Sequence, residues 1–107
     1  MEINFKDWQN LDLKVAEVLE VKDHPNADKL YILKIDLGNE KRKIVAGIKG
    51  HYSKESLKGK KIIVFANLKP VDIRGIKSQG MLLAASNKGK VVVLGPDKDI
   101  EPGSKIS

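Results

Sequence analysis

The chain has 107 residues, with 20 Lys and Arg, 14 Asp and Glu, and no cysteine. This length corresponds to one domain, residues 1–107, that can bury a core without cross-links, and the lack of cysteine excludes a disulfide framework, a thiolate zinc site and a cysteine nucleophile. No apolar run approaches the ~20 residues that span a membrane, and no basic segment leads into an apolar stretch at the N-terminus, so we expect a cytoplasmic protein.

Positive charge is concentrated in the middle of the chain. Residues 41–77 hold eleven Lys and Arg against two acidic residues, a net charge of +9, whereas residues 1–40 carry −4 and residues 78–107 carry +1. This asymmetry favours a polyanionic partner, although a solvated lysine-rich surface gives the same count.

The first predicted elements are a helix and two strands. Phe5 and Trp8, three residues apart, form one apolar face of a short N-terminal helix packed on the rest of the fold. Apolar alternation then predicts a long, bent strand from Leu11 to Val21 and a second from Tyr31 to Leu37. Between them, His24–Asp28 has the composition of a turn.

The middle of the chain continues in short elements. A third strand runs from Lys41 to Ala46, and a short helix follows it, capped by Ser53 and ended by Gly59. A fourth strand then runs from Lys61 to Ala66.

The last third of the chain begins with a long, basic, glycine-punctuated loop from Asn67 to Gly80, a kind of segment that is often functional. Met81–Ala85 returns to strand, and a hairpin turn at residues 87–89 leads into Lys90–Leu94. Five strands with a helix between the third and fourth follow the element order of an OB-fold, a partly open barrel that commonly binds oligonucleotides. We therefore predict an all-β fold, a five-stranded OB-fold barrel with a short helix between strands 3 and 4, a short N-terminal helix and extra C-terminal strands.

The titratable residues form no catalytic constellation. His24 and His51 are the only histidines, a metal site would need carboxylates that the sequence does not place beside them, and His24 fits its turn. Gly59-Lys60-Lys61 lacks the surroundings of a phosphate-binding P-loop. Asp72 is the one acid in the basic loop, where we expect it to bond the backbone or a lysine. We expect no catalysis, no metal and no cofactor.

Two common RNA-binding modes fit poorly. Residues 47–50 match a GxxG loop, but the segment before them is β-branched, whereas a KH loop joins two helices. The five aromatic residues are too scattered to form the stacking platform of an RRM. Contacts of Lys and Arg with phosphates therefore point to a folded RNA recognised by its backbone shape.

Three segments, in order, carry a family resemblance: His24–Leu30, Ala66–Pro70 and Arg74–Met81. They resemble the tRNA-binding domain of stand-alone tRNA-binding proteins, of the C-terminal part of many methionyl-tRNA synthetases and of cofactors of synthetase complexes. The resemblance runs from about Phe5 to the C-terminus, and it implies structure-specific, non-catalytic binding of the tRNA body on an OB barrel with C-terminal additions. Two positions depart from the family pattern: Ala16 replaces a glycine, which puts a glycine-dependent bulge in doubt, and Ala46 replaces a serine.

At matching positions the resemblance implies a binding face formed by Asn67, Lys69, Arg74, Ser78 and Met81. The Asn and Ser side chains would bond ribose or phosphate and the two cations would neutralise phosphates, whereas the methionine can either touch a base or pack in the core. By charge alone, supporting contacts are expected from Lys29, Lys41, Arg42 and Lys43.

The resemblance also implies partners. Stand-alone members are homodimers through their C-terminal strands, and Val91–Leu94 with Ile100 suits either that interface or an ordinary core. The leading hypothesis is the separate beta subunit of methionyl-tRNA synthetase, raising the affinity of the catalytic chain for tRNA. An alternative is a dimeric OB-fold secretion chaperone that binds unfolded polypeptide, whose members generally lack the His24–Asp28 turn. A third, a domain of the phenylalanyl-tRNA synthetase large subunit, is disfavoured by the start at Met1 and the complete ending.

Overall fold

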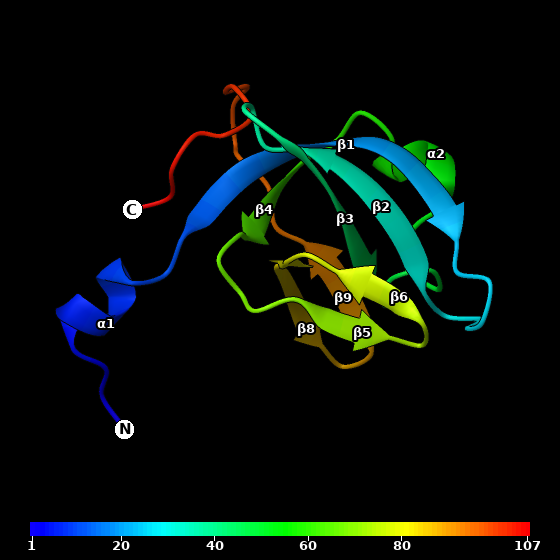
Figure 1. Ribbon diagram of the computed structural model, residues 1–107, viewed down its shortest axis with the longest axis horizontal. Coiled ribbons are helices and arrows are strands. Elements are labelled where there is room, and N and C mark those ends of the chain that lie inside the picture. The colour runs from blue at the N-terminus through cyan, green and yellow to red at the C-terminus, as the bar shows by residue number, and fades with distance from the viewer.

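A five-stranded antiparallel sheet, in the order β3-β2-β1-β4-β7, coils into an OB-fold-like barrel (Figure 1). The computed structural model describes all residues, 1–107. Its elements are α1 (Phe5–Gln9), β1 (Leu13–Asp23), β2 (Tyr31–Asp36), β3 (Lys41–Ala46), α2 (Lys54–Leu57), β4 (Lys61–Phe65), β5 (Val71–Ile73), β6 (Ile76–Ser78), β7 (Met81–Leu82), β8 (Ala84–Asn87) and β9 (Lys90–Val93). The predicted barrel, with a helix between its third and fourth strands, is confirmed.

The long first strand, β1, pairs with a different strand along each half of its length. Residues 13–17 of β1 pair with β4, and residues 17–23 pair with β2, with a shift of register between Val18 and Glu20. Ala16 is fully buried and pairs regularly with Ile62, so the irregularity lies a few residues further along. A β-bulge bends and twists a strand, and here it lets one strand cross from one half of the barrel to the other.

Apolar side chains from all five barrel strands meet inside. The largest fully buried ones include Leu33, Ile35, Ile44 and Ile62, and Leu57 from α2 joins them with no exposed surface. The cap predicted for α2 is present, because Ser53 Oγ accepts a hydrogen bond from the backbone N–H of Ser56 at 3.2 Å.

The two termini of the chain pack against the N-terminal half of β1. The C-terminal segment hydrogen-bonds the part of this strand that β2 does not cover, through Val15 N–H to Ser104 O (2.9 Å) and Ile106 N–H to Leu13 O (2.9 Å). Trp8 of α1 packs on the small apolar cluster beside it, but Phe5 is 71% exposed. The predicted apolar face of α1 is therefore wrong for Phe5, because five residues of helix bring only one of the two rings onto the barrel.

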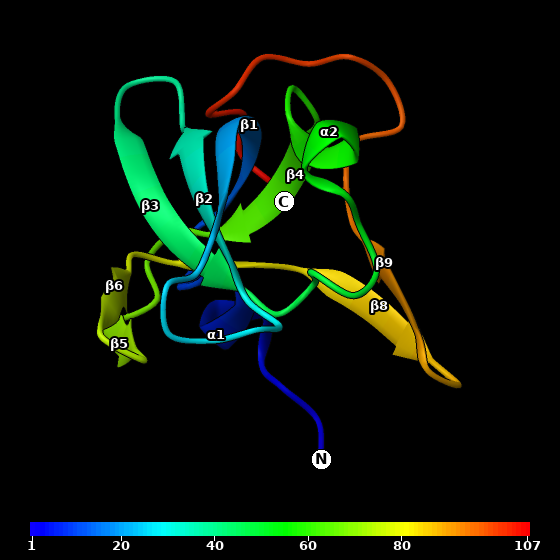
Figure 2. The same cartoon turned by 90° about the vertical axis from the view of Figure 1, so that its right-hand side faces the viewer.

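The region after β4 differs from the prediction in two places. The predicted loop from Asn67 to Gly80 contains the hairpin β5–β6. The predicted strand Met81–Ala85 divides, because β7 pairs with β4 inside the barrel whereas β8 leaves it to pair with β9. The hairpin β8–β9 projects from the barrel (Figure 2). None of the helices has the length and apolar character required to cross a membrane.

Candidate nucleic-acid interface

The basic loop is organised around a small hairpin, residues 71–78, which we call the basic hairpin. Its strands turn at Arg74 and Gly75, which have positive φ values of 55° and 92°. Two-residue hairpin turns favour positive φ at both positions because their twist then matches that of the strands. Asp72 Oδ1 accepts a hydrogen bond from Gly75 N–H at 2.8 Å, as expected for the lone acid of this loop.

The turn His24–Asp28 holds the tip of the basic hairpin. His24 is 5% exposed; its Nδ1 accepts from Asn26 N–H at 3.0 Å, so its Nε2 carries the proton and donates to Ile73 O at 2.9 Å. Asn26 Nδ2 donates to Arg74 O (3.2 Å), and Arg74 Nη2 donates back to Asn26 O (3.0 Å). Two of the three segments behind the family resemblance therefore fasten to each other.

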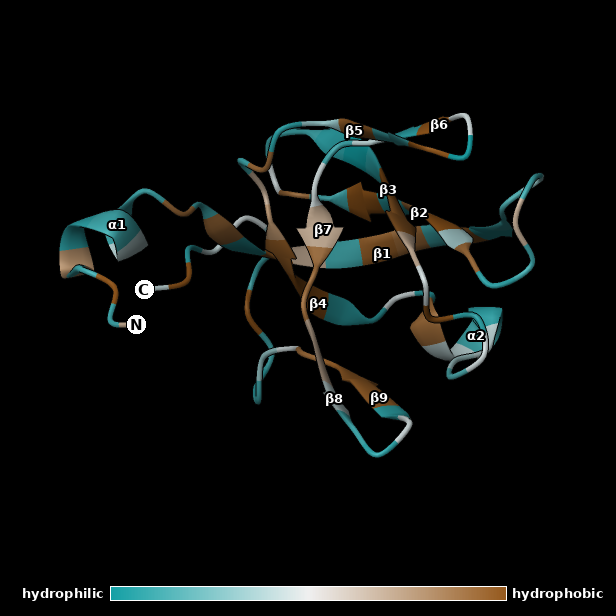
Figure 3. Cartoon of the chain, turned by 90° about the horizontal axis from the view of Figure 1, so that it is seen from below, coloured by the Kyte–Doolittle hydropathy of each residue, from teal (hydrophilic) through white to brown (hydrophobic).

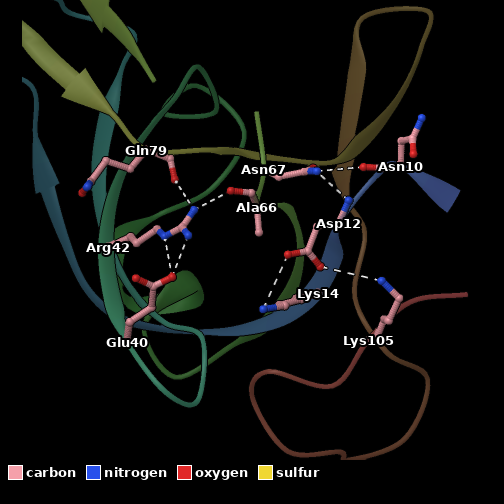
Figure 4. Close-up of polar contacts among 9 residues, drawn as sticks. All are labelled: Asn10, Asp12, Lys14, Glu40, Arg42, Ala66, Asn67, Gln79 and Lys105. Carbon is pink, nitrogen blue, oxygen red and sulfur yellow. Dashed lines mark hydrogen bonds and ion pairs between the residues drawn. The ribbon is translucent and has the colours of Figure 1, made fainter. Parts of the chain in front are cut away.

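The third segment anchors the start of the loop. Asn67 Oδ1 accepts from Asp12 N–H at 2.8 Å, and Asn67 Nδ2 donates to Asn10 O at 2.7 Å (Figure 4). Ala66 N–H also donates to Asp12 O at 2.7 Å. Both ends of the Asn67 amide are thus engaged by the segment that precedes β1.

Ser78 lies inside the molecule, 3% exposed, where the barrel closes between β3 and β7. Its hydroxyl accepts from Val45 N–H (3.0 Å) and donates to Gly80 O (2.8 Å). The neighbouring Gln79 N–H donates to Lys43 O at 2.9 Å. These bonds link β3, one edge of the five-stranded sheet, to the segment that leads into β7, the other edge, where no regular strand pairing is present.

Arg42 reaches across the same opening of the barrel. Its Nη1 donates to the carbonyl oxygens of Ala66 and of Gln79, the latter at 3.3 Å. Its Nε and Nη2 donate to Glu40 Oε1, at 3.0 and 2.6 Å (Figure 4). The side chain is 24% exposed, and its donors already have internal partners.

The outer face of β1, β2 and β3 carries a hollow of about 330 Å³, which we call the lysine groove. Strand pairing places Lys34 opposite Lys43 and Asp36 opposite Lys41 on this face. The residues lining the groove are Glu20, Lys22, Ile32, Lys34, Lys41, Arg42, Lys43 and Gln79.

Unpaired cations gather at the groove and the basic hairpin. Of the eleven Lys and Arg in residues 41–77, four form ion pairs, among them Lys61 with Asp99 (2.6 Å). These pairs act on their acids: Lys54 and Lys49 hold the pKa of Asp23 below its ordinary value, and Lys61 does the same for Asp99. Of the seven left unpaired, four lie on the groove or the basic hairpin, Lys41, Lys43, Arg74 and Lys77, and Lys69 lies two residues before the hairpin.

The predicted site residues differ in exposure and in whether their side chains have partners within the chain. Lys29, Lys41, Lys43, Lys69 and Arg74 are exposed, and so is Met81, at 50%. Asn67 is exposed as well, but its side chain, like those of Ser78, Arg42 and Arg74, has hydrogen-bond partners within the chain. The contacts of all these residues with RNA stay a prediction.

Three cations of the lysine groove and the basic hairpin were not predicted from the sequence: Lys22, Lys34 and Lys77. Lys34 alternates with the core residues of its strand, so its outward direction was readable from the sequence. Its position beside Lys43 depends on the register between β2 and β3, which the sequence alone does not reveal.

Comparison with known proteins supplies the family. Residues 13–105 match a family described as a putative tRNA binding domain. The chain is 51% identical over 104 residues to the methionine–tRNA ligase of Thermococcus onnurineus, a match that covers 97% of this chain and 14% of that enzyme. It is 52% identical over 105 residues to the methionine–tRNA ligase of Caldanaerobacter subterraneus, covering 98% of this chain and 16% of that enzyme.

Two solved structures are similar along their whole length. A protein related to methionyl-tRNA synthetase from Pyrococcus horikoshii superposes with a TM-score of 0.93 and 35% identity, and the match covers 100% of both chains. The chaperone CsaA from Bacillus anthracis superposes with a TM-score of 0.90 and 31% identity, again over 100% of both chains. From the family match and these relatives, the chain belongs to the putative tRNA-binding domain family and is related to the methionine–tRNA ligases.

Proposed function

We propose that the chain binds the body of folded tRNA along the lysine groove and the basic hairpin. The observation that carries this proposal is the gathering of unpaired cations on a hairpin held at both ends, beside a lysine-lined hollow. Cations clustered in a groove focus the electrostatic potential and attract a polyanion. Because most of the contacts available here are to phosphates, recognition depends on where the RNA fold places its backbone.

Base stacking contributes little on this face. Phe5 is the one aromatic residue that is mostly exposed, and it lies on α1, away from the groove and the hairpin (Figure 1). Stacking on aromatic rings is a main source of affinity for single strands, at ~1 to 3 kcal/mol per base. Structure-specific binding of a folded RNA therefore fits the face better than binding of a single strand. Met81 of β7, which is 50% exposed, is an apolar residue available to a base or sugar.

In the cell, we propose, the chain acts as the beta subunit of a methionyl-tRNA synthetase and raises the affinity of the catalytic chain for tRNA. The relation to methionine–tRNA ligases, of which the chain matches 14% to 16%, supports this role. Catalysis then belongs to the synthetase chain, and this chain supplies binding energy.

A homodimer is part of this proposal. All four residues of β8 are exposed, whereas in β9 Val91 and Val93 pack against the barrel core and Val92 is exposed. Val92, Leu94 and Ile100 are 43%, 41% and 47% exposed, and Figure 3 shows hydrophobic residues along β9. A second copy packed on these exposed apolar side chains would remove them from water, which is favourable, and it would add a second set of cations to the assembly.

The test of tRNA binding is Lys69→Ala, because the Lys69 side chain is exposed and has no partner in the fold. We expect weaker binding, and a log–log salt slope reduced by about 0.7 to 0.9 for the lost phosphate contact. Arg74→Ala should weaken binding further, because it also removes the bond to Asn26 O.

Lys58→Ala, which replaces an exposed lysine near α2, is the matched control. Filter binding at two salt concentrations measures both quantities. Unchanged affinity in both variants, or binding without salt dependence, would contradict the proposal.

Competition separates structure-specific binding from attraction to any polyanion. Intact tRNA should displace labelled tRNA more effectively than the same RNA cut into fragments. Equal competition would mean that the face binds RNA without regard to its fold.

A second candidate function is that of a chaperone for unfolded polypeptide. Its support is the similarity to two CsaA chaperones, the one from Picrophilus torridus superposing with a TM-score of 0.92 and 35% identity. Suppression of the aggregation of an unfolded protein, measured with and without tRNA, distinguishes the two. If unfolded polypeptide binds and tRNA does not, the chaperone function is the correct one.

A further inference from the structure

The basic hairpin joins the barrel through a narrow neck. The chain leaves the barrel at Ala66 and returns at Gln79, and the carbonyl oxygens of these two residues accept hydrogen bonds from the same atom, Arg42 Nη1. One guanidinium therefore ties the start of the segment to its end.

The rest of the guanidinium fixes its own direction. Nε and Nη2 both donate to Glu40 Oε1, so the planar group is held from one side while Nη1 points into the neck. A guanidinium offers five donors in a rigid fork, whereas a lysine ammonium is a single point of charge on a flexible stem. Lysine would keep the charge at this position, but it cannot hold Glu40 and both carbonyl oxygens in this arrangement.

We propose that Arg42 is a positioning residue for RNA binding, which closes the neck and so holds Lys69, Arg74 and Lys77 beside the lysine groove. This inference rests on the proposed function. It assigns to Arg42 a different part from a phosphate contact, because each of its three guanidinium nitrogens already donates a hydrogen bond within the chain.

The physical need for such a residue follows from the size of the hairpin. Strands of three residues cannot hold their place unaided. The tip is fastened by the turn at His24–Asp28. At the neck, Ala66 N–H bonds Asp12 O and Gln79 N–H bonds Lys43 O, so each side is tied to its own neighbour, and Arg42 is the group that bonds both sides at once. If the neck opens, the hairpin cations must be ordered when RNA binds, and this cost in entropy reduces the affinity.

The decisive variant is Arg42→Lys, which keeps the positive charge and removes the fork. A phosphate contact would largely survive this change, whereas closure of the neck would not. We expect Arg42→Lys to bind tRNA about tenfold more weakly than the wild type, equivalent to about 1.4 kcal/mol, and Arg42→Met to bind no better. Lys41→Met, an exposed neighbour without an ion pair, is the matched control for loss of charge on the same strand.

A second readout needs no RNA. In the free protein, amide hydrogen exchange in residues 71–78 should be at least tenfold faster in Arg42→Lys than in the wild type, and unchanged in Lys41→Met. Far-UV circular dichroism and urea unfolding establish that Arg42→Lys is folded under the conditions used. The Lys variant therefore decides the question even if the Met variant does not fold.

The outcomes separate the two proposals. If the wild type binds tRNA and Arg42→Lys binds equally well, or its hairpin exchanges at the wild-type rate, the positioning role is wrong. If the wild type does not bind tRNA, the proposed function is wrong, and faster exchange in Arg42→Lys would then show only that this residue holds the hairpin.

Discussion

The side-chain amide of Asn67 joins parts of the chain that are 55 and 57 residues apart in sequence, Asp12 and Asn10. Replacing Asn67 by Ala removes an acceptor from one backbone group and a donor from another. We expect Asn67→Ala to lower the free energy of unfolding by about 1 kcal/mol, as measured by urea denaturation.

The control for this change is Lys69→Ala, two residues further along, which should leave stability within about 0.5 kcal/mol of the wild type. A different result would be informative. If Asn67→Ala unfolds like the wild type but loses tRNA affinity, its amide serves the RNA and not the fold.

Polar residues whose side chains bond distant parts of the fold are the ones whose role could not be predicted from the sequence. Ser78 and Arg42 stand in a polar, basic sequence, and both resemble ligands for a phosphate there. Each also has a partner 24 to 37 residues away in the sequence. Ser78 bonds Val45, and Arg42 bonds Ala66 and Gln79. Lys69 was predictable as an exposed cation because it needs no partner, whereas a buried role depends on contacts that only the fold supplies.

At the scale of elements, an ion pair at the C-terminal end of β1 links this strand to α2. The Asp23 carboxylate contacts Lys54 of α2 at 2.9 Å and Lys49 at 3.0 Å. Lys54, and then Lys49, hold the pKa of this carboxyl below its ordinary value, and Asp23 in turn raises the pKa of Lys54. A folded-state pKa below the unfolded one means that the ionised form stabilises the folded state.

We therefore expect Asp23→Asn to lower the urea midpoint at neutral pH. The stabilising contribution of Asp23 is complete above its unfolded pKa of about 3.9 and is lost as the pH falls through the lower folded value. The difference between Asp23→Asn and the wild type should thus vanish in acid, and it should shrink in high salt because the pair is exposed. Asp28→Asn, in the following turn, is the control. A difference that persists in acid would assign the effect to something other than this ion pair.

Prediction of the elements succeeded where periodicity was long enough to read. Alternation over β1 and β2 predicted both strands, with β1 ending two residues later than expected. The strands β5 and β6 have three residues each and turn at Arg74, a residue that rarely signals a turn with positive φ, so this segment resembled a loop. The division of residues 81–85 between β7 and β8 reflects a change of pairing partner, which leaves no trace in the hydrophobic pattern.

At the scale of the whole molecule, two hairpins leave the barrel on different sides. The basic hairpin, β5–β6, and the hairpin β8–β9, whose second strand carries the exposed Val92, lie at opposite sides of the view in Figure 2. A surface used for self-association at β8–β9 would therefore leave the lysine groove and the basic hairpin open. A homodimer built in this way would present two RNA-binding faces.

The proposed dimer gives the last prediction. Wild-type protein should sediment as a dimer, and the double variant Val92→Lys, Leu94→Lys should sediment as a monomer, because it places charges where an apolar surface would be buried. Phe5→Lys, which puts the same charge on an exposed apolar residue of α1, should remain a dimer. The log–log salt slope scales with the number of phosphates contacted. If one tRNA contacts both protomers, the monomeric variant should bind tRNA with about half the wild-type slope, and if each protomer binds its own tRNA, the slope should stay the same. A monomeric wild type would contradict the dimer, and dissociation by Phe5→Lys alone would move the interface from β9 to α1.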